Sequence, residues 1–340
     1  MTQAPDRAKA VPMDVLSEVL SVVKLDAALF FNAEFTAPWC VRSSGRALAP
    51  YLSPAATNLI IYHFVTEGHA YAQLADGRRE VLGAGDIVVI PHGETHLLGN
   101  GSNVRPVDSA KAFAGNLTQG LKVAHMGGGG ETTRFVCGFM ACDPRLGEVL
   151  LTGLPSILKV RVTNEASGQW LAESIRYSVG EGGGPNPGSG LVLSRLSELL
   201  FVETLRRYIS SLPPDETGWL AGARDPAIGQ ALALMHQEPA HPWTISNLAR
   251  GVGLSRTRLA ERFRHFLGES PIAYLSRWRL KLGAEILQST EHSVSEVAAA
   301  VGYGSEAAFN RAFKREFDSP PAQFRRTRKT QGAAGTGRNL

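Results

Sequence analysis

The chain has 340 residues, 44% of them hydrophobic and 19% charged, a balance typical of a folded globular protein rather than a disordered one. Its apolar runs are much shorter than the roughly 18 residues that a membrane-spanning helix needs, and its first residues lack the apolar core of a secretory signal, so we expect no membrane association. Three cysteines are too few for a disulfide scaffold and fit a cytoplasmic protein. The net charge of +4 combines a slightly acidic first part with a basic last third, which points to a polyanion as partner.

The first half of the chain predicts short strands. An apolar run at 58–65 is followed by runs at 70–74, 80–82, 87–90 and, later, 134–140. Short strands separated by Gly, Pro and Asp-Gly turns predict an all-β antiparallel barrel or jelly roll. Four consecutive glycines at 127–130 predict a flexible connection between two of these strands.

A spaced motif lies between two of the predicted strands. Gly85, Pro91, Gly93, His96 and Asn100 match the pattern G-x5-P-x-G-x2-H-x3-N at every fixed position. This pattern is the second cupin motif, so the segment resembles a cupin barrel. The resemblance implies a cupin-like ligand-binding or regulatory domain over residues 1–180, with the His96 side chain inside the barrel.

The first cupin motif is incomplete in this chain. The resemblance implies a His-x-His and a Glu, but the matching stretch has only His63 and Glu67. A non-heme iron site needs two His and a carboxylate, so oxygenase chemistry is disfavoured. Four side chains could form a partial site for a divalent metal such as zinc, or part of an effector pocket: His63, His92, His96 and Cys137. The alternatives are that His96 is a hydrogen-bonding group and that Cys137 is a small buried apolar residue.

The middle of the chain predicts a linker and one long helix. Residues 180–190 contain six glycines and two prolines, a density that no helix or strand interior tolerates. Residues 191–212 have apolar side chains at helical spacing, within a helical linker or dimerisation region at 191–224. This apolar stripe can pack against a second copy and form a homodimer, or it can pack on its own barrel.

Residues 225–330 predict an all-α domain built from an internal repeat. This region holds 15 Lys and Arg against 10 Asp and Glu, and residues 246–275 resemble residues 295–324. Each copy encodes a short helix, a tight turn and a longer helix, which is a helix-turn-helix. A helix over 271–289, about 27 Å long, joins the copies and can place them in successive major grooves about 34 Å apart.

Capping residues define the ends of these helices. Thr244 and Ser255 cap the two helices of the first copy, while Ser293, with Glu296, and Ser305 cap those of the second. The four apolar side chains that face inward in the longer helices are assigned to the core: Leu259, Phe263, Phe309 and Phe313. The tail at 331–340 is small and polar and predicts disorder.

The repeat carries a family resemblance. The segments WTISNLA (243–249), PIAYLSRWRL (271–280) and FKREF (313–317) look like the AraC/XylS DNA-binding domain over about 225–328, with Asp318 where that family usually has Gly. The resemblance implies a transcription regulator with an N-terminal cupin-like sensor. It implies as partners double-stranded DNA, a small-molecule effector, a second copy of the chain and, for the activator that we expect, RNA polymerase.

The resemblance also implies which residues contact DNA. Base edges are read from the exposed start of each longer helix, at matching positions in the two copies: Thr257, Ala260, Glu261, Ala307, Asn310 and Arg311. An Arg can pair with guanine, an Asn with adenine and a Glu with cytosine, although Glu261 can instead form a salt bridge with Arg258 or Arg262. Phosphate contacts, which position without specifying sequence, are expected from a second set: Arg256, Arg258, Arg262, Lys314, Arg325 and Arg326.

Two other function classes stay open. A metal-dependent cupin enzyme fused to a DNA-binding domain would turn over a small substrate, whereas we expect no catalysis. An architectural DNA binder, whose barrel only dimerises, would show the same DNA affinity with and without any ligand.

Overall fold

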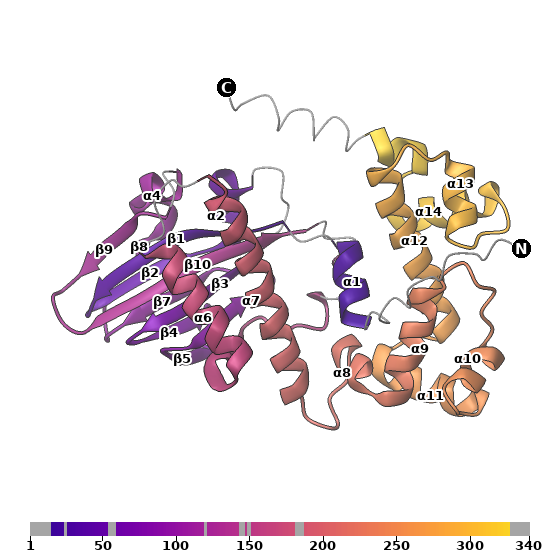
Figure 1. The fold of residues 1–340 in the computed structure, drawn as a ribbon, viewed down its shortest axis with the longest axis horizontal. Coiled ribbons are helices and arrows are strands. Elements are labelled where there is room, and N and C mark those ends of the chain that lie inside the picture. Colours follow the sequence, from indigo (N-terminus) through magenta and orange to yellow (C-terminus); the bar gives the residue numbers. More distant parts are fainter. Residues whose placement is uncertain are drawn as a thin grey trace, which may run out of the picture. The chain divides into compact units, whose positions relative to one another are not determined.

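The computed structural model describes residues 15–23, 26–53, 59–118, 121–142, 147, 151–180 and 187–326 (Figure 1). The chain divides into two compact units. A β-rich unit spans residues 24–215, and a helical unit comprises residues 216–340 together with residues 1–23. The predicted disordered tail at 331–340 and most of the predicted linker at 180–190 lie outside the described residues.

The β-rich unit has two sheets that face each other across an apolar core. The six-stranded sheet has the order β11-β6-β3-β10-β1-β9 and the five-stranded sheet the order β5-β4-β7-β2-β8. The strands are β1 Asp26–Thr36, β2 Trp39–Ser43, β3 Leu59–Glu67, β4 His69–Leu74, β5 Arg79–Gly83, β6 Asp86–Ile90, β7 His96–Asn100, β8 Val107–Asp108, β9 Val123–Gly127, β10 Thr132–Ala141 and β11 Leu158–Arg161. The prediction of a cupin-like barrel is confirmed, since side chains of both sheets share one core.

The four glycines at 127–130 form a tight turn, so the predicted flexible connection is wrong. The Gly128 N–H donates to the Thr36 carbonyl and the Gly130 N–H to the Ala37 carbonyl. Gly127 has a φ of 134°, and a Cβ there would lie 1.8 Å from the Thr36 oxygen. Only glycine allows this close approach between the turn and the end of β1.

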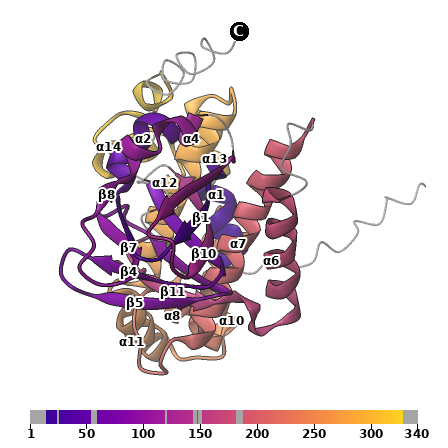
Figure 2. The same cartoon turned by 90° about the vertical axis from the view of Figure 1, so that its left-hand side faces the viewer.

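Helices cover parts of the β-rich unit. They are α2 Gly45–Leu52, α3 Ser109–Ala112, α4 Ala114–Thr118, the 3-10 helix η1 Val162–Asn164, α6 Ala166–Val179 and α7 Ser189–Ser211. Figure 2 shows α6 and α7 side by side beside the strands, and α7 packs on β1. The predicted helix over 191–212 is therefore confirmed as α7. Half of its predicted stripe, Leu196, Leu200 and Leu205, is buried within the β-rich unit, whereas Leu199 of the same stripe is exposed.

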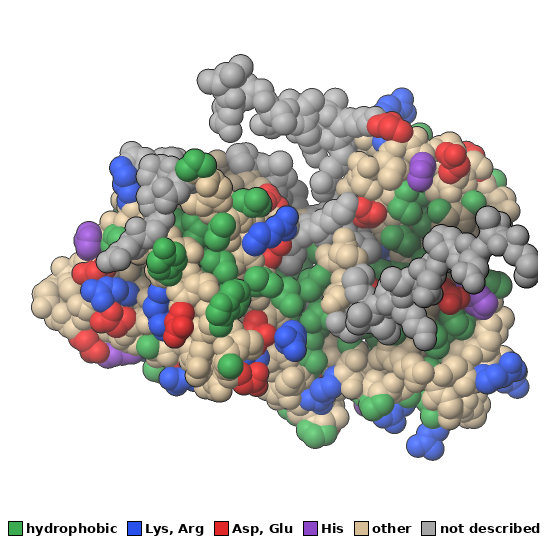
Figure 3. All heavy atoms as spheres, in the orientation of Figure 1, with side chains coloured by type: hydrophobic (Ala, Val, Ile, Leu, Met, Phe, Trp, Pro, Cys, Tyr) green, Lys and Arg blue, Asp and Glu red, His purple; other side chains and the backbone are tan. Residues whose placement is uncertain are grey.

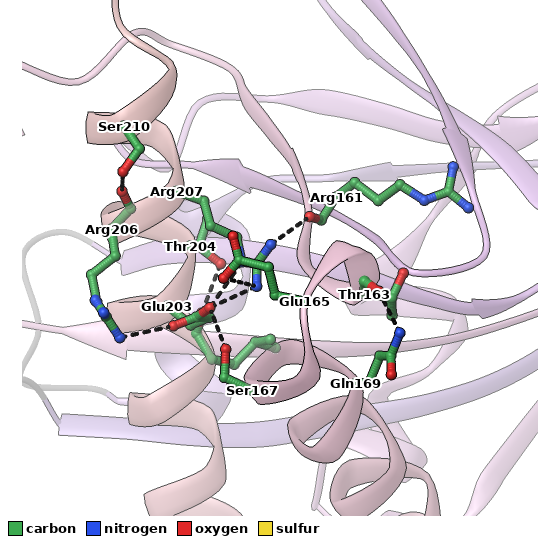
Figure 4. Close-up of polar contacts among 11 residues, drawn as sticks. Arg161, Thr163, Glu165, Ser167, Gln169, Glu203, Thr204, Arg206, Arg207 and Ser210 are labelled. Carbon is green, nitrogen blue, oxygen red and sulfur yellow. Dashed lines mark hydrogen bonds and ion pairs between the residues drawn. The ribbon is translucent and has the colours of Figure 1, made fainter.

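An ion-pair network fixes α7 against α6 and η1 (Figure 4). The Glu203 carboxylate accepts hydrogen bonds from Ser167 Oγ at 3.0 Å and from the Arg207 Nε at 2.9 Å. Arg207 also pairs with Glu165 and donates to the Arg161 carbonyl. Both Glu203 and Arg207 have side chains only 11% exposed, so the pair is largely shielded from solvent screening.

The helical unit contains the repeat. Its helices are α1 Val15–Val23, α8 Trp219–Arg224, α9 Pro226–Gln237, α10 Ile245–Gly251, α11 Arg256–Leu267, α12 Pro271–Ser289, α13 Val294–Ala300 and α14 Glu306–Phe317. The two helix-turn-helix copies are α10–α11 and α13–α14, joined by α12 as predicted. Among the described residues, no helix is long and apolar enough to cross a membrane.

The boundaries of the two units differ from the predicted domains. Residues 15–23, expected in the barrel domain of 1–180, form α1, which packs against α9 and α12 of the helical unit. Its apolar side chains Val15, Leu16, Val19 and Val23 are buried. The predicted separate region at 191–224 is divided as well, since α7 belongs to the β-rich unit and α8 to the helical unit.

Candidate nucleic-acid interface and effector pocket

The two helix-turn-helix copies are built by the same local devices. Thr244 and Ser293 cap α10 and α13 as predicted. Both form capping boxes, Ser293 with the predicted Glu296 and Thr244 with Asn247. The turns contain Gly253 and Gly302, with φ values of 69° and 80°, which glycine adopts without strain. The predicted core side chains of α11 and α14 are fully buried, which fixes the opposite face of each helix toward solvent.

The predicted base-reading residues lie at matching places on these two helices. Thr257 and Glu261 on α11 are exposed, as are Ala307 and Arg311 on α14. The two remaining positions, Ala260 and Asn310, are half-buried, and the Asn310 amide lies 3.5 Å from the Glu306 carboxylate. The DNA contacts of all six residues stay predictions, and four of the six have exposed side chains.

Arg262 is partly exposed and is paired with a carboxylate of the same unit, so its predicted phosphate contact stays a prediction. Its Nε lies 3.1 Å from the Asp225 Oδ1, and a second guanidinium nitrogen pairs with the other carboxylate oxygen. The salt bridge considered between Glu261 and Arg262 is therefore not formed. Asp225 also caps α9, where it accepts hydrogen bonds from the Ala227 and Ile228 N–H groups, so the pair ties α11 to α9.

The charge state of Asp225 follows from these partners. Burial alone would raise the pKa of this carboxyl, but hydrogen bonds from Arg262 and from the Ile228 backbone hold the pKa below its ordinary value. The carboxylate is thus ionised throughout the neutral range, and its pair with Arg262 stabilises the fold there.

Arg325 is engaged in a comparable way. Its guanidinium donates to the Leu287 carbonyl at 3.1 Å and to the His292 carbonyl, just before α13 begins. Arg279 makes the matching contacts before α10, with the Pro239 and His241 carbonyls. The other predicted phosphate-contacting residues have exposed side chains: Arg256, Arg258, Lys314 and Arg326.

In the β-rich unit, three of the four predicted metal or effector residues meet. His63 on β3 lies opposite Cys137 on β10, and the His63 Nδ1 is 2.8 Å from the Cys137 Sγ. His96 reaches them from the other sheet, with its Nε2 2.7 Å from the His63 Nε2. His92 does not join them, because it is exposed and its Nε2 lies 3.1 Å from the Leu154 carbonyl.

The contact between His96 and the Glu94 carbonyl fixes the direction of every hydrogen bond in this cluster. The His96 Nδ1 lies 2.9 Å from the Glu94 carbonyl, which can only accept, so the Nδ1 carries a proton. A neutral His96 then accepts at Nε2 from the His63 Nε2–H, and the His63 Nδ1 accepts from the Cys137 thiol. The result is an ordered chain of three uncharged groups.

Burial keeps this chain uncharged. It lowers the pKa of His96 to about 4, lowers that of His63 well below its ordinary value, and raises that of the Cys137 thiol. The Glu94 carbonyl works against this shift at His96 but is the smaller effect. Near pH 7 the cluster therefore presents no charge to the barrel interior.

The arrangement does not fit a single metal ion. His63 lies between the other two side chains and directs opposite ring nitrogens at them, whereas an ion must be approached by one nitrogen from each ligand. Among the described residues, no group of three or more His, Cys, Asp or Glu side chains is placed to hold a metal. Zinc binding stays a prediction, to be tested by metal analysis of the protein and of a His96→Ala variant.

A pocket opens beside this cluster. It encloses about 390 Å³ of space free of protein atoms, part of it open to solvent. Its described lining is mostly aromatic and aliphatic, with four polar residues: Phe30, Phe31, Phe35, Val41, Ser43, Leu48, His63, Leu98, Ser109, Phe113, Leu117, Phe135 and Cys137. Of these lining residues, only His63 and Cys137 were predicted from the sequence. The aromatic wall of the pocket was not predicted. The three phenylalanines that stand close together in the sequence, Phe30, Phe31 and Phe35, could have indicated it.

Known proteins resemble the chain in both regions. Residues 14–210, more than half of the chain, match the family described as "Cupin", and residues 248–327 match the "Helix-turn-helix domain" family. The chain is 28% identical to the "HTH-type transcriptional regulator AlkR" of Acinetobacter baylyi, over 92% of this chain and 99% of that one. It is 30% identical to a "Putative AraC-like transcription regulator" of Streptomyces lividans, over 92% and 98%.

A solved structure resembles part of the chain. A transcriptional regulator with an AraC-type DNA-binding domain from Chromobacterium violaceum is 29% identical over 30% of this chain and 92% of that one, with a TM-score of 0.30. The two regulators named above are matched over nearly their whole length. In this chain the cupin match precedes the helix-turn-helix match. The chain therefore belongs to the AraC-like family of transcription regulators.

Proposed function

We propose that this DNA-binding transcription regulator is an effector-responsive activator that acts as a homodimer in the cytoplasm. The observation that carries the proposal is the apolar pocket in the barrel of a chain that also has two exposed recognition helices. Binding of a small molecule in the pocket changes how the two helix-turn-helix copies engage DNA, and the bound regulator recruits RNA polymerase.

The β-rich unit offers a physical route from the pocket to α7. Neighbouring residues of a strand face opposite sides of a sheet, so His63 lines the pocket while Tyr62 lies on the outer face. The Tyr62 hydroxyl is 2.5 Å from the Ser197 Oγ of α7, and both residues are fully buried. A shift of β3 at the pocket thus acts directly on α7, the last helix of the β-rich unit before the chain enters the helical unit.

Homodimer formation is assigned to the outer face of α6 and α7. Five large apolar side chains are exposed on these two helices, among charged ones such as Arg176 and Arg195 (Figure 3): Trp170, Tyr177, Leu191, Val192 and Leu199. Several exposed apolar residues on two adjacent helices are typical of an association surface. Analytical ultracentrifugation should give a dimer, and Tyr177→Glu with Leu199→Glu should give a monomer.

The experiment for the DNA-binding function uses the full chain. Duplexes selected from a random library by the protein are compared with scrambled duplexes of equal length at fixed salt, by fluorescence anisotropy. Selected duplexes should bind at least about a thousandfold more tightly. Equal affinity for both would overturn sequence-specific recognition and favour the architectural alternative.

The enzyme alternative has a separate readout. Transcription from a promoter bearing the selected site, with purified polymerase, tests activation, while turnover of candidate substrates by the full chain tests catalysis. Activation without turnover supports the proposal. Turnover abolished by His96→Ala, without any effect on transcription, would replace it.

A further inference from the structure

The pocket differs from most polar binding sites in having no charged wall. Its described lining contains nine Phe, Val and Leu residues and no Lys, Arg, Asp or Glu. Two carboxylates directly precede lining residues in the chain, and both have partners elsewhere: Asp108 accepts from the Lys111 backbone N–H and caps α3, and Glu34 pairs with Arg134. An ion placed in such a pocket would lose its hydration without gaining a partner, which costs several kcal/mol.

The side chains of the His63–His96–Cys137 chain, which adjoins the pocket, are uncharged and already paired with one another. The His63 ring uses both nitrogens, one with Cys137 and one with His96, so it has none left for a ligand. The proton order set by the Glu94 carbonyl keeps all three groups neutral. Neither an anion nor a cation finds a counter-charge there.

Two serines, Ser43 and Ser109, complete the polar part of the lining. Of these, the hydroxyl that is fully buried without a hydrogen-bond partner among the described residues is that of Ser109. A buried hydroxyl without a partner is less stable than a paired one. A ligand with a hydrogen-bonding group would satisfy it.

Aromatic rings surround the rest of the space. The Phe31 and Phe113 rings lie 5.0 Å apart, and Phe35 is stacked on Phe113 at 5.6 Å. Ser109, Phe113 and Leu117 follow at intervals of four along the α3–α4 segment, so one face of this segment forms a single wall of the pocket. Flat or flexible apolar bodies both fit such walls.

We propose that the pocket takes a small uncharged molecule with an aromatic or aliphatic body and one hydrogen-bonding group, which pairs with the Ser109 hydroxyl. This inference rests on the proposed function, because it names the class of effector for the same pocket. It goes beyond that function by excluding carboxylates and amines, and by assigning the recognition of the polar group to a residue outside the His63–His96–Cys137 chain.

The test uses matched probes that differ in charge. Benzyl alcohol, benzoate and benzylammonium form an aromatic series, hexanol, hexanoate and hexylammonium an aliphatic one, and toluene lacks the hydrogen-bonding group. Binding to the full chain at pH 7 is measured by ligand-observed NMR titration. The variants are Ser109→Ala and, as the control, Ser102→Ala at an exposed serine of the same unit.

We expect the alcohols to bind at least about tenfold more tightly than the ions of the same shape. Ser109→Ala should weaken benzyl alcohol binding about fivefold, the loss of one hydrogen bond, and leave toluene unchanged. Ser102→Ala should change neither. Tighter binding of either ion, an equal effect of Ser109→Ala on toluene, or no binding by any probe would each overturn the inference.

The DNA affinity of the same samples separates this inference from the proposed function. An ion that binds the pocket and changes the affinity for a selected duplex overturns the ligand class but keeps the effector-responsive regulator. Alcohol binding at Ser109 that leaves DNA affinity and transcription unchanged keeps the ligand class and overturns the effector response.

Discussion

The two helix-turn-helix copies share a framework and differ in how their charges are used. Both have a capped first helix, a left-handed glycine and an arginine that binds the carbonyls preceding the copy, Arg279 in the first and Arg325 in the second. In the first copy, however, Arg262 of the recognition helix is tied to Asp225, while the corresponding position in the second is Ala312. The guanidinium of Arg262 is thus shared with an internal partner, whereas the second copy has no basic residue at that position.

The pair that distinguishes the first copy carries the largest expected effect. Arg262→Ala leaves Asp225, whose side chain is 7% exposed, without its counter-charge. Because Arg262 itself is 41% exposed and partly screened, we expect a loss of about 2 kcal/mol in the free energy of unfolding. Urea denaturation followed by circular dichroism measures it, with the exposed Arg264→Ala as the matched control.

The same pair gives a pH dependence with a defined sign. The pKa of Asp225 is lower in the folded chain than in the unfolded one, so its contribution is present at neutral pH. That contribution is lost as the pH falls through the folded-state pKa. The stability difference between wild type and Asp225→Asn should thus narrow below about pH 4. A difference that stays constant from pH 7 to pH 3 would contradict the ionic role.

The second copy should instead show its difference in base recognition. Arg311 is exposed on α14, and a bidentate contact with guanine is worth about 1–3 kcal/mol at one base pair. Arg311→Ala should lose that amount on the selected duplex and very little on duplexes altered at that base pair. Arg311→Lys keeps the charge and should lose nearly as much, since lysine lacks the planar fork. Equal weakening on every duplex would make Arg311 a phosphate contact.

A smaller effect separates two arginines of one recognition helix. Arg256 is exposed at the start of α11, whereas Arg262 is held by Asp225. Arg256→Ala should weaken binding on all duplexes alike and reduce the slope of log affinity against log salt by about 1. Arg262→Ala, corrected for its unfolded fraction, should leave that slope unchanged. A reduced slope for Arg262→Ala would confirm the phosphate contact that the sequence predicted.

These contrasts also explain what the sequence can predict. The helices of both copies follow from local signals, since caps such as Ser255 and glycines such as Gly253 act within a few residues. The tie between Asp225 and Arg262 joins residues 37 positions apart, so no spacing rule indicates it. From the sequence alone, Arg262 and Arg325 could therefore not be distinguished from the arginines whose side chains are exposed.

The pocket was harder to predict for the same physical reason. Burial alternates along most of β1, and apolar and polar residues alternate from Phe31 to Thr36, so the sequence carried a strand signal here that the prediction missed. The partner of β1, β10, lies about a hundred residues later in the chain, and their pairing brings Phe31 beside Cys137. The motif residue His96 could be predicted because its spacing is local, whereas Ser109 and Phe113 became recognisable only in three dimensions.

The smallest expected effect lies where the two recognition helices end. Both end on a left-handed residue, Gly268 with a φ of 74° in the first copy and Asp318 with a φ of 54° in the second. A side chain is strained in this conformation, and a carboxylate at a helix C-terminus is repelled by the helix dipole. Asp318→Gly should therefore stabilise the chain by about 0.5–1 kcal/mol, part of the gain being offset by the greater freedom of glycine in the unfolded chain.

Two further variants separate the causes of this effect. Asp318→Asn removes the charge but keeps the side chain, so its gain measures the dipole effect alone. Gly268→Asp imposes the strain on the first copy and should destabilise by a similar amount, since nothing lies within 4 Å of a Cβ placed there. If Asp318→Gly destabilised the chain while Gly268→Asp did so too, Asp318 would have a stabilising contact that its counterpart lacks, and the two helix ends would not be equivalent.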